Sequence, residues 1–269
     1  MTKLVVTGAT GRMGQTLCKL IQAEPGFTLV GATVRAHSPA LGQTAAAALG
    51  LPGEAFQLQS NLHSCAAADA VIDFTLPEAL PEHVAACVAL GLPLVVGTTG
   101  LQAEHEALLN AASERIPVLW APNMSMGVAL LQQLVEQAAR ALGAGYDVEV
   151  LEMHHRHKVD APSGTALALG AAAARGLDRD LQANAVYGRE GAEGPRQANT
   201  IGFATLRGGD VIGEHTVFLA GAGERLELGH RASTRDTFAH GALRAAQWLQ
   251  TQPNGRYDMR HVLGLKPSA

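Results

Sequence analysis

A short apolar strand that leads through a glycine turn into a helix most constrains what this chain can fold into. Residues 4–7 read Leu-Val-Val-Thr, and Gly8-Ala9-Thr10-Gly11-Arg12-Met13-Gly14 follows them directly. Residues 15–23 then carry apolar side chains at helical spacing. Because the glycines let backbone N–H groups and a helix N-terminus approach a pyrophosphate, the pattern favours dinucleotide binding. The spacing departs from strict G-x-G-x-x-G, so a glycine turn without a ligand stays an alternative.

Strand and helix patterns alternate through the rest of the first half. Further strand-like runs occur at residues 27–34, 70–75, 94–96 and 117–120. Helical patterns separate the later runs, and one of them opens at Pro77, a residue that suits a first helical turn. This alternation predicts a parallel, doubly wound sheet, and therefore an α/β chain with a Rossmann-type dinucleotide-binding domain over residues 1–124.

The pattern changes after residue 124. A polar, glycine-rich segment at 176–200 is expected to form a flexible loop. Three strands joined by glycine turns are expected to pair antiparallel, at 200–206, 210–220 and 224–230. Helices are expected at 127–142, 165–175 and 233–250, with a strand at 146–153. We therefore predict a C-terminal α+β substrate domain with a mixed sheet over residues 125–235, and a first domain completed by residues 236–269.

Charge and cysteine usage exclude several classes of protein. The formal net charge of -4 gives no reason to expect nucleic acid as a partner. Cys18, Cys65 and Cys87 are widely spaced in apolar or alanine-rich surroundings, which is typical of buried thiols in a reducing compartment and not of disulfides or a metal site. No signal peptide is visible, and no apolar run approaches the ~20 residues of a membrane helix. We expect a cytoplasmic protein without metal or membrane partners.

The end of the second strand bears on the choice of cofactor. An NAD-preferring protein carries an acidic residue there, which binds the adenosine ribose. This chain has Val34 at that position and Arg35 after it, so no carboxylate would repel a 2′-phosphate and a guanidinium is available to bind one. We predict NADPH as the preferred cofactor, with weaker use of NADH. The alternative is that Arg35 is an ordinary surface residue.

The stretch from Glu152 to Thr165 concentrates cationic and proton-handling groups. Five consecutive residues carry three imidazoles, a guanidinium and an ammonium group: His154, His155, Arg156, His157 and Lys158. A charge run is usually a solvated turn. This one follows an apolar strand, is rich in His, which titrates near neutral pH, and leads into a helix N-terminus. The combination favours a site that holds and protonates a small anionic substrate.

The corner Ser163-Gly164-Thr165 is suited to binding a carboxylate. Pro162 stiffens the entry, Gly164 removes side-chain bulk, and Thr165 offers a hydroxyl beside helix N–H groups. A carboxylate there would gain charge-assisted hydrogen bonds and the helix dipole. A plain Ser or Thr N-cap is the simpler alternative.

Other side chains of the same stretch have roles that the spacing leaves open. Lys158 is a candidate proton donor. Glu152 is expected either to orient an imidazole or to pair with Arg156. His154 and His155 are consecutive, so in a strand they point to opposite faces, and only one of them can face a substrate unless the strand has already ended.

Several stretches together resemble the dihydrodipicolinate reductases (4-hydroxy-tetrahydrodipicolinate reductases) of lysine biosynthesis. In chain order they are residues 8–14, Ile72-Asp73-Phe74-Thr75, Gly97-Thr98-Thr99-Gly100, Ala121-Pro122-Asn123-Met124-Ser125, Glu152 to Thr165 and Thr200-Ile201-Gly202-Phe203-Ala204. The resemblance covers essentially the whole chain. The His-His-Arg-His-Lys-Val-Asp-Ala-Pro-Ser-Gly-Thr block is very specific to that family, whereas the glycine turn is not.

The resemblance implies a role for each matching residue. It implies that His154 is a proton donor and acceptor, that Lys158 is a second proton donor, and that His155, Gly164 and Thr165 bind substrate. The residues implied to line the nicotinamide cofactor are Gly8, Ala9, Thr10, Gly11, Arg12, Met13, Gly97, Thr98, Thr99, Ala121, Pro122, Asn123 and Met124. The implied reaction reduces a small cyclic dicarboxylate with NAD(P)H and loses water. The implied assembly is a homotetramer built through the mixed sheet.

Two other interpretations stay open. Residues Thr7-Gly8-Ala9-Thr10-Gly11 also resemble the opening of atypical short-chain dehydrogenases that bind NADP as redox sensors or scaffolds without transferring hydride. Such a protein would have no reason to carry the cationic block next to a helix N-terminus. The second alternative is another amino-acid-type dehydrogenase with the same fold.

Overall fold

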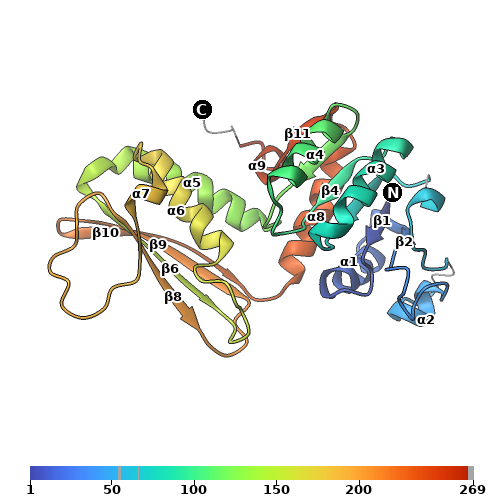
Figure 1. Ribbon diagram of the computed structural model, residues 1–269, viewed down its shortest axis with the longest axis horizontal. Helices are drawn as coiled ribbons and strands as arrows, with labels where there is room; N and C mark the ends of the chain where they lie inside the picture. Colours follow the sequence, from blue (N-terminus) through green and yellow to red (C-terminus); the bar gives the residue numbers. More distant parts are fainter. Residues whose placement is uncertain (54–55, 66, 266–269) are drawn as a thin grey trace. The chain divides into compact units, whose positions relative to one another are not determined.

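The computed structural model describes residues 1–53, 56–65 and 67–265, and the chain forms two compact units (Figure 1). The first unit combines Met1–Ser125 with Arg235–Ala269, and the second unit is Met126–Thr234. The second unit is therefore an insertion in the sequence of the first. No helix in the described ranges is long and apolar enough to cross a membrane.

Six parallel strands form the sheet of the first unit. In spatial order they are β11 (Gly255–Tyr257), β5 (Pro117–Trp120), β4 (Leu94–Val96), β3 (Ala70–Asp73), β1 (Thr2–Thr7) and β2 (Phe27–Ala32). All of their pairings are parallel. The strand order reverses at β1, and ligands of such sheets bind at the carboxyl ends of the strands near that point. The Rossmann-type parallel sheet expected from the sequence is confirmed.

Helices cover both faces of this sheet. On one face α1 (Arg12–Ala23) packs beside α8 (Asp236–Leu249), and on the other α3 (Leu80–Leu90) packs beside α4 (Ala103–Ser113). Strand β1 is buried on both sides, which is why it reads as a continuous apolar run. The remaining short elements are α2 (Ala45–Leu49), α9 (Met259–Val262), η1 (His63–Cys65) and η2 (Pro77–Ala79). The helix expected to open at Pro77 is confirmed as η2 leading into α3.

The C-terminal segment contributes an edge strand that the sequence pattern did not indicate. Strand β11 has only three residues and pairs with β5, so it is too short to show a periodicity. Before it, α8 packs closely on the chain that leaves β5. A Cβ on Gly241 would lie 1.8 Å from the carbonyl oxygen of Met124, so only glycine allows this approach.

The second unit has a mixed sheet covered on one face by helices. Its strands, in spatial order, are β10 (Glu224–Ala232), β9 (Gly213–Gly221), β6 (Asp147–His154), β8 (Ile201–Arg207) and β7 (Ala185–Tyr187). Helices α5 (Met126–Leu142) and α6 (Gly164–Gly176) lie side by side over one face, with η3 (Gly143–Gly145) and α7 (Leu181–Asn184) as short additions (Figure 1). The mixed sheet expected from the sequence is confirmed.

The pairing expected within that sheet is partly wrong. Strands β9 and β10 pair antiparallel as expected, but β8 does not pair with β9. Strand β6 lies between them, parallel to β8 and antiparallel to β9. Strand β6 carries the buried core residues Val148 and Val150, so the central position removes more apolar surface from water than an edge position would.

Residues 176–200, which were expected to form a flexible loop, contain regular secondary structure and form ion pairs. Residues 181–187 form α7 and β7. Beyond them, Arg196 forms ion pairs with Asp147 and Glu149, and Arg189 pairs with Glu149 as well. The expectation of an unstructured loop is therefore wrong for much of the segment, because its polar residues have partners on strand β6 that lie far away in the sequence.

Candidate active site

The carboxyl end of β6 places an imidazole against a buried carboxylate. Nδ1 of His154, the last residue of β6, lies 2.5 Å from Oε2 of Glu152. Glu152 is 1% exposed and His154 is 8% exposed. Because Glu152 engages Nδ1, proton exchange falls to Nε2. A Cβ at position 213 would come within 3.0 Å of Nε2, so Gly213 on β9 leaves room for that nitrogen.

Arg207 and the start of α6 complete the surroundings of Glu152. Two guanidinium nitrogens of Arg207 donate to the two Glu152 oxygens, each at 2.9 Å. The parallel register of β6 and β8 sets Arg207 opposite His154. The Ser163 N–H donates to Glu152 Oε1 at 3.1 Å. The expectation that Glu152 orients an imidazole is confirmed, whereas pairing with Arg156 is wrong because Arg207 takes that place.

This arrangement sets the protonation of both partners. Burial would raise the pKa of Glu152, but hydrogen bonds from Arg207, His154 and Ser163 outweigh it and hold that pKa below its ordinary value. Burial lowers the pKa of His154, and the nearby charges of Lys158 and Arg207 lower it further, although Glu152 opposes them. The pair is therefore a carboxylate and a neutral imidazole at neutral pH.

A second buried imidazole, His215 on β9, lies against the first. The two rings meet edge to face, with their centroids 5.0 Å apart. Nε2 of His215 lies 3.1 Å from the Ser163 hydroxyl, and its Nδ1 has no hydrogen-bond partner within the described ranges. Burial, and then the repulsion that a protonated His154 would exert, lowers the pKa of His215 to about 4, so this ring is neutral. Sequence reasoning missed His215 because nothing local marks which strand faces β6.

The cationic run continues beyond the end of β6. Since the strand ends at His154, His155 lies outside it, and its Nδ1 is buried without a hydrogen-bond partner among the described residues. The His155 and His157 rings lie with centroids 6.3 Å apart. Nζ of Lys158 donates to Asp160 Oδ1 at 2.7 Å. The peptide bond between Ala161 and Pro162 is cis.

The corner after this run is the N-terminus of α6. Ser163 is the N-cap, and its hydroxyl accepts from the Ala166 N–H at 3.2 Å. Gly164 and Thr165 are the first two helical residues. A Cβ on Gly164 would meet nothing within 4 Å, so the space beside this helix end is open. The simpler alternative, a Ser N-cap, is therefore observed, and the first turn of the helix that Ser163 caps faces open space.

The segments expected to line a dinucleotide share one edge of the first sheet. Gly8–Met13 follow β1, Gly97–Thr99 follow β4, and Ala121–Met124 follow β5. These three strands are parallel members of one sheet, so their carboxyl ends meet at the same edge. Thr98 is 2% exposed, and the Asn123 side chain accepts from the Ser125 N–H at 2.9 Å.

The glycine turn fits a dinucleotide. Gly8 has a φ of 64°, a conformation that favours glycine. A Cβ on Gly14 would come within 2.2 Å of the Gly8 carbonyl oxygen, so α1 packs directly on the turn. Gly11 is the N-cap of α1, and no side-chain hydrogen bond caps that end of the helix within the described chain. A helix N-terminus that receives an anion needs this arrangement.

Arg35 lies just beyond the second strand. Val34 is buried and its N–H donates to the Gln59 carbonyl oxygen at 2.8 Å, whereas Arg35 is exposed. The Arg35 side chain therefore lies at the surface, just beyond the carboxyl end of β2.

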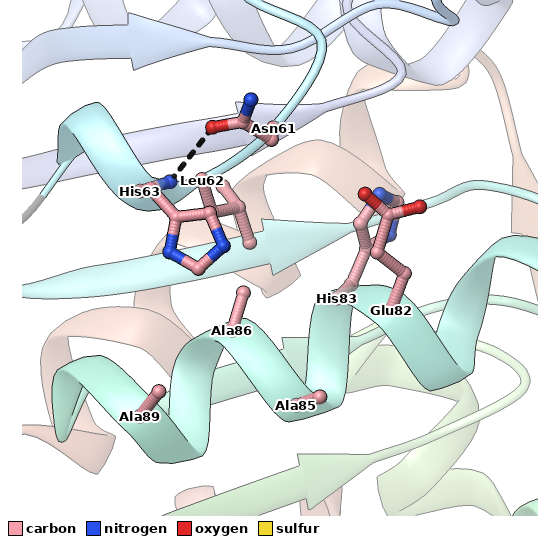
Figure 2. A pocket seen from close by; sticks show the side chains of 8 residues that line it. All are labelled: Asn61, Leu62, His63, Glu82, His83, Ala85, Ala86 and Ala89. Carbon is pink, nitrogen blue, oxygen red and sulfur yellow. Dashed lines mark hydrogen bonds between the residues drawn. The ribbon is translucent and has the colours of Figure 1, made fainter.

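A cavity of about 330 Å³ also opens in the first unit. Figure 2 shows it between the segment that precedes β3 and one face of α3. Its lining residues are Asn61, Leu62, His63, Glu82, His83, Ala85, Ala86 and Ala89. None of them was expected to be a site residue. Among the described residues, no group of three or more His, Cys, Asp or Glu side chains is arranged to hold a metal ion.

The fold and the buried His–Glu pair define a class before any relative is considered. A Rossmann-type sheet with a glycine turn after β1, in one chain with a mixed-sheet unit that holds a buried carboxylate–imidazole pair, is the construction of nicotinamide-dependent oxidoreductases.

Comparisons with known proteins identify the family within that class. Two family models match, described as dihydrodipicolinate reductase, N-terminus, over residues 2–124 and dihydrodipicolinate reductase, C-terminus, over residues 127–263. Proteins of Thiobacillus denitrificans and Alkalilimnicola ehrlichii named 4-hydroxy-tetrahydrodipicolinate reductase are each 52% identical, covering 98% of this chain and 99% of the relative. The chain belongs to the dihydrodipicolinate reductase family.

A solved structure agrees with this assignment. The dipicolinate-bound dihydrodipicolinate reductase from Paenisporosarcina sp. TG-14 matches with a TM-score of 0.73 and 25% identity, covering 96% of this chain and 97% of that one. A probable dehydrogenase from Thermotoga maritima, 8% identical with a TM-score of 0.61, shares the fold alone over 97% of this chain and 92% of that one.

Proposed function

We propose that the protein reduces 4-hydroxy-tetrahydrodipicolinate to tetrahydrodipicolinate with NAD(P)H and loss of water, as a step of lysine (diaminopimelate) biosynthesis. The buried Glu152–His154 pair beside the N-terminus of α6 carries this proposal, because it joins a proton-handling group to an anion-binding helix end. The relatives that are 52% identical bear the name of this activity. Dipicolinate, which the Paenisporosarcina protein binds, is a ring with two carboxylates.

The chain's own residues would hold the substrate through its carboxylates. The first turn of α6, at Gly164 and Thr165, faces open space with its dipole positive end outward. His155 follows β6 directly, and its buried Nδ1 has no partner in the described chain, as expected of a group that binds a ligand. A substrate carboxylate bound here would gain charge-assisted hydrogen bonds.

Proton handling would be divided between two groups. A reduced nicotinamide, when bound, supplies the hydride. Lys158 carries an ammonium group that can give a proton to the reacting ring. His154 is neutral at neutral pH, and Glu152 engages its Nδ1, so Nε2 can accept a proton and return it. Glu152 would stabilise the imidazolium while it exists.

Arg35 would set the preference for NADPH. An exposed guanidinium at the end of the second strand can pair with a 2′-phosphate, and no carboxylate stands at position 34. We expect Arg35→Ala to raise the dissociation constant of NADPH by about tenfold or more, since hydrogen bonds to charged groups contribute ~1.5–3 kcal/mol. Titration calorimetry with both cofactors measures this. Lys19→Ala, an exposed charge on α1, is the control, and equal losses for NADPH and NADH would contradict the assignment.

The uncovered face of the second sheet would form a homotetramer interface. The face away from α5 and α6 carries Leu151, Met153, Phe218 and the 47% exposed Leu206. Apolar side chains gathered on one open sheet face favour association with another copy. Light scattering of the wild type and of Leu206→Lys tests this, with a tetramer expected only for the first.

The thiols support a reducing, cytoplasmic setting. Cys18, Cys65 and Cys87 are all buried, and none of them is part of a disulfide bond. Burial raises the pKa of Cys18 to about 12, so that thiol is unreactive.

A direct assay tests the reaction. Pyruvate and aspartate semialdehyde condense to give the substrate, and NADPH oxidation is followed at 340 nm. We expect rapid loss of absorbance with the wild type. Binding of NADPH without any loss of absorbance would favour a redox sensor over a reductase.

A further inference from the structure

Asp73 is a buried carboxylate that the proposed reaction does not use. It ends β3 and its side chain is fully buried. Its Oδ1 accepts hydrogen bonds from the Thr75 N–H at 3.0 Å, the Thr75 hydroxyl at 2.8 Å and the Thr98 hydroxyl at 2.8 Å. Its Oδ2 lies 2.5 Å from Nδ1 of His83 on α3. One carboxylate therefore connects three separate segments of the first unit.

Two of these segments meet the expected cofactor residues. A Cβ on Gly8 would lie 2.9 Å from the Thr75 methyl carbon, so Thr75 packs directly on the glycine turn. The backbone N–H of Gly97 donates to the Asp73 carbonyl oxygen at 2.8 Å. Thus the Asp73 side chain holds Thr75 against the turn after β1. The main chain and the side chain of Asp73 together hold residues 97–98.

The loop after β4 is fixed at Thr98 from several sides. Its hydroxyl donates to Asp73 and accepts from the Thr75 N–H at 3.1 Å. Its carbonyl oxygen accepts from Nε1 of Trp120 on β5 at 3.1 Å. The position of this loop between β3 and β5 consequently depends on the carboxylate at its centre.

His83 makes a charged carboxylate tolerable at this place. Burial would raise the pKa of Asp73, but the hydrogen bond and charge of His83, together with hydrogen bonds from Thr75, hold that pKa below its ordinary value. The other donors to the carboxylate within the described ranges are neutral, and none comes from Lys or Arg. Without His83 the carboxylate would lose its strongest partner in an apolar core.

We propose that the Asp73–His83 pair positions the loops after β3 and β4 for the nicotinamide dinucleotide, so that His83 acts on cofactor affinity through Asp73 and Thr98. This rests on the proposed function, since it takes these loops to bind the cofactor. His83 is a positioning residue and not a catalytic one. Its loss should therefore weaken cofactor binding while leaving kcat at saturating cofactor and the KM for the dicarboxylate close to their wild-type values.

The test compares two replacements of His83 with a replacement of a histidine that pairs with a carboxylate on the surface. His83→Asn keeps a side-chain N–H donor near the place of Nδ1, whereas His83→Ala removes it. The control is His240→Ala, because His240 also faces a carboxylate, Glu24, at 3.7 Å but on the surface. Dissociation constants for NADPH are measured by calorimetry without substrate, and steady-state constants are measured separately.

We expect His83→Ala to raise the dissociation constant of NADPH by about tenfold or more, the usual effect of losing a hydrogen bond to a charged group. His83→Asn should recover most of this loss, and His240→Ala should show none. Amide exchange of residues 97–101 without cofactor should become faster in His83→Ala only. Unchanged NADPH affinity in a folded His83→Ala, with only a lower melting temperature, would overturn the proposal.

A second variant keeps the proposal testable if His83→Ala does not fold. Thr98→Val preserves shape and removes the hydroxyl that bonds Asp73, so it should also weaken NADPH, and normal affinity would overturn the proposal. Failure of the proposed reaction would give a different result. The wild type and the variants would then show the expected differences in NADPH affinity, but none of them would reduce the substrate. A wild type that binds no dinucleotide would overturn both.

Discussion

Two pairs of a buried carboxylate and an imidazole, one in each unit, share their geometry and differ in the charges around them. In both Asp73–His83 and Glu152–His154, Nδ1 lies 2.5 Å from a carboxylate oxygen. Glu152 also receives both guanidinium nitrogens of Arg207. Asp73 receives only neutral hydroxyl and amide donors besides His83, among the described residues.

That difference fits the two roles proposed above, which are proton handling for Glu152–His154 and positioning for Asp73–His83. Where Arg207 already balances the carboxylate, the imidazole need not hold a proton, and the pKa of His154 falls under the influence of burial. Where the other donors are neutral, burial would raise the pKa of Asp73, and the contact with His83 makes the largest opposing contribution. In these proposals the same contact serves two purposes, and the presence of the Arg207 cation distinguishes them.

The largest expected effect comes from replacing the imidazole of His154 by asparagine, compared with the same replacement at His83. His154→Asn keeps a donor toward Glu152 but removes Nε2, so kcat should fall by ~10²–10⁴-fold, the usual range for lost acid–base catalysis. His83→Asn should keep turnover close to the wild type. Steady-state NADPH oxidation measures both, and Lys158→Met should resemble His154→Asn. Equal losses in the two asparagine variants would erase the distinction between the pairs.

An effect of intermediate size is expected in the dependence of the free energy of unfolding on acid pH. It should differ between His215, which lies against His154, and Asp73 of the other pair. His215 has a pKa of about 4 in the fold against 6.5 in a model peptide, so between those values the unfolded chain binds a proton that the folded chain does not. Stability therefore falls as the pH drops from 7 to 5, by about 2 kcal/mol from this group. The lowered pKa of Asp73 contributes stability that is present above 3.8 and is lost only at lower pH.

Urea denaturation of the wild type and of His215→Gln at pH 7 and pH 5 measures this contribution. The variant should lose less stability between the two values, whereas His63→Gln, an exposed imidazole of the first unit, should follow the wild type. Parallel pH dependence in all three proteins would remove His215 as the source.

The smallest effect is a shift in the pH profile of kcat. It is expected when the Glu152–His154 pair loses its cation and so comes to resemble Asp73–His83. Arg207→Met removes a positive charge that lowers the pKa of His154, so that pKa should rise. The limb of the kcat profile that follows His154 should therefore move to higher pH. Arg196→Met, which removes a partner of Glu149 instead, serves as the control. An unmoved profile would show that Arg207 does not tune the pair.

Local patterns carried much of the fold and part of the site. The run Leu4–Thr7 followed by Gly8 indicated a strand and a turn, and both are observed, because burial on two faces leaves an apolar run and a positive φ favours glycine. Ser163 was recognisable as a helix start for the same local reason. The three-residue strand β11 was not, since it is too short to show a period.

Partners across the sheets could not be read in the same way. The sequence suggested Arg156, which is near in the chain, as an ion-pair partner of Glu152. The observed partner is Arg207, 55 residues away. His215 was missed because its position opposite Glu152 depends on strand register.

The sequence by itself determined the α/β alternation, the glycine turn, the cationic run after residue 153 and the family, since each is written in contiguous residues. Only the tertiary structure decided that Arg207 balances Glu152 and that Asp73 holds Thr98 and His83. The physical reason is that these contacts depend on which strands lie side by side and in what register. The burial of the whole sheet sets that choice, and no single segment encodes it.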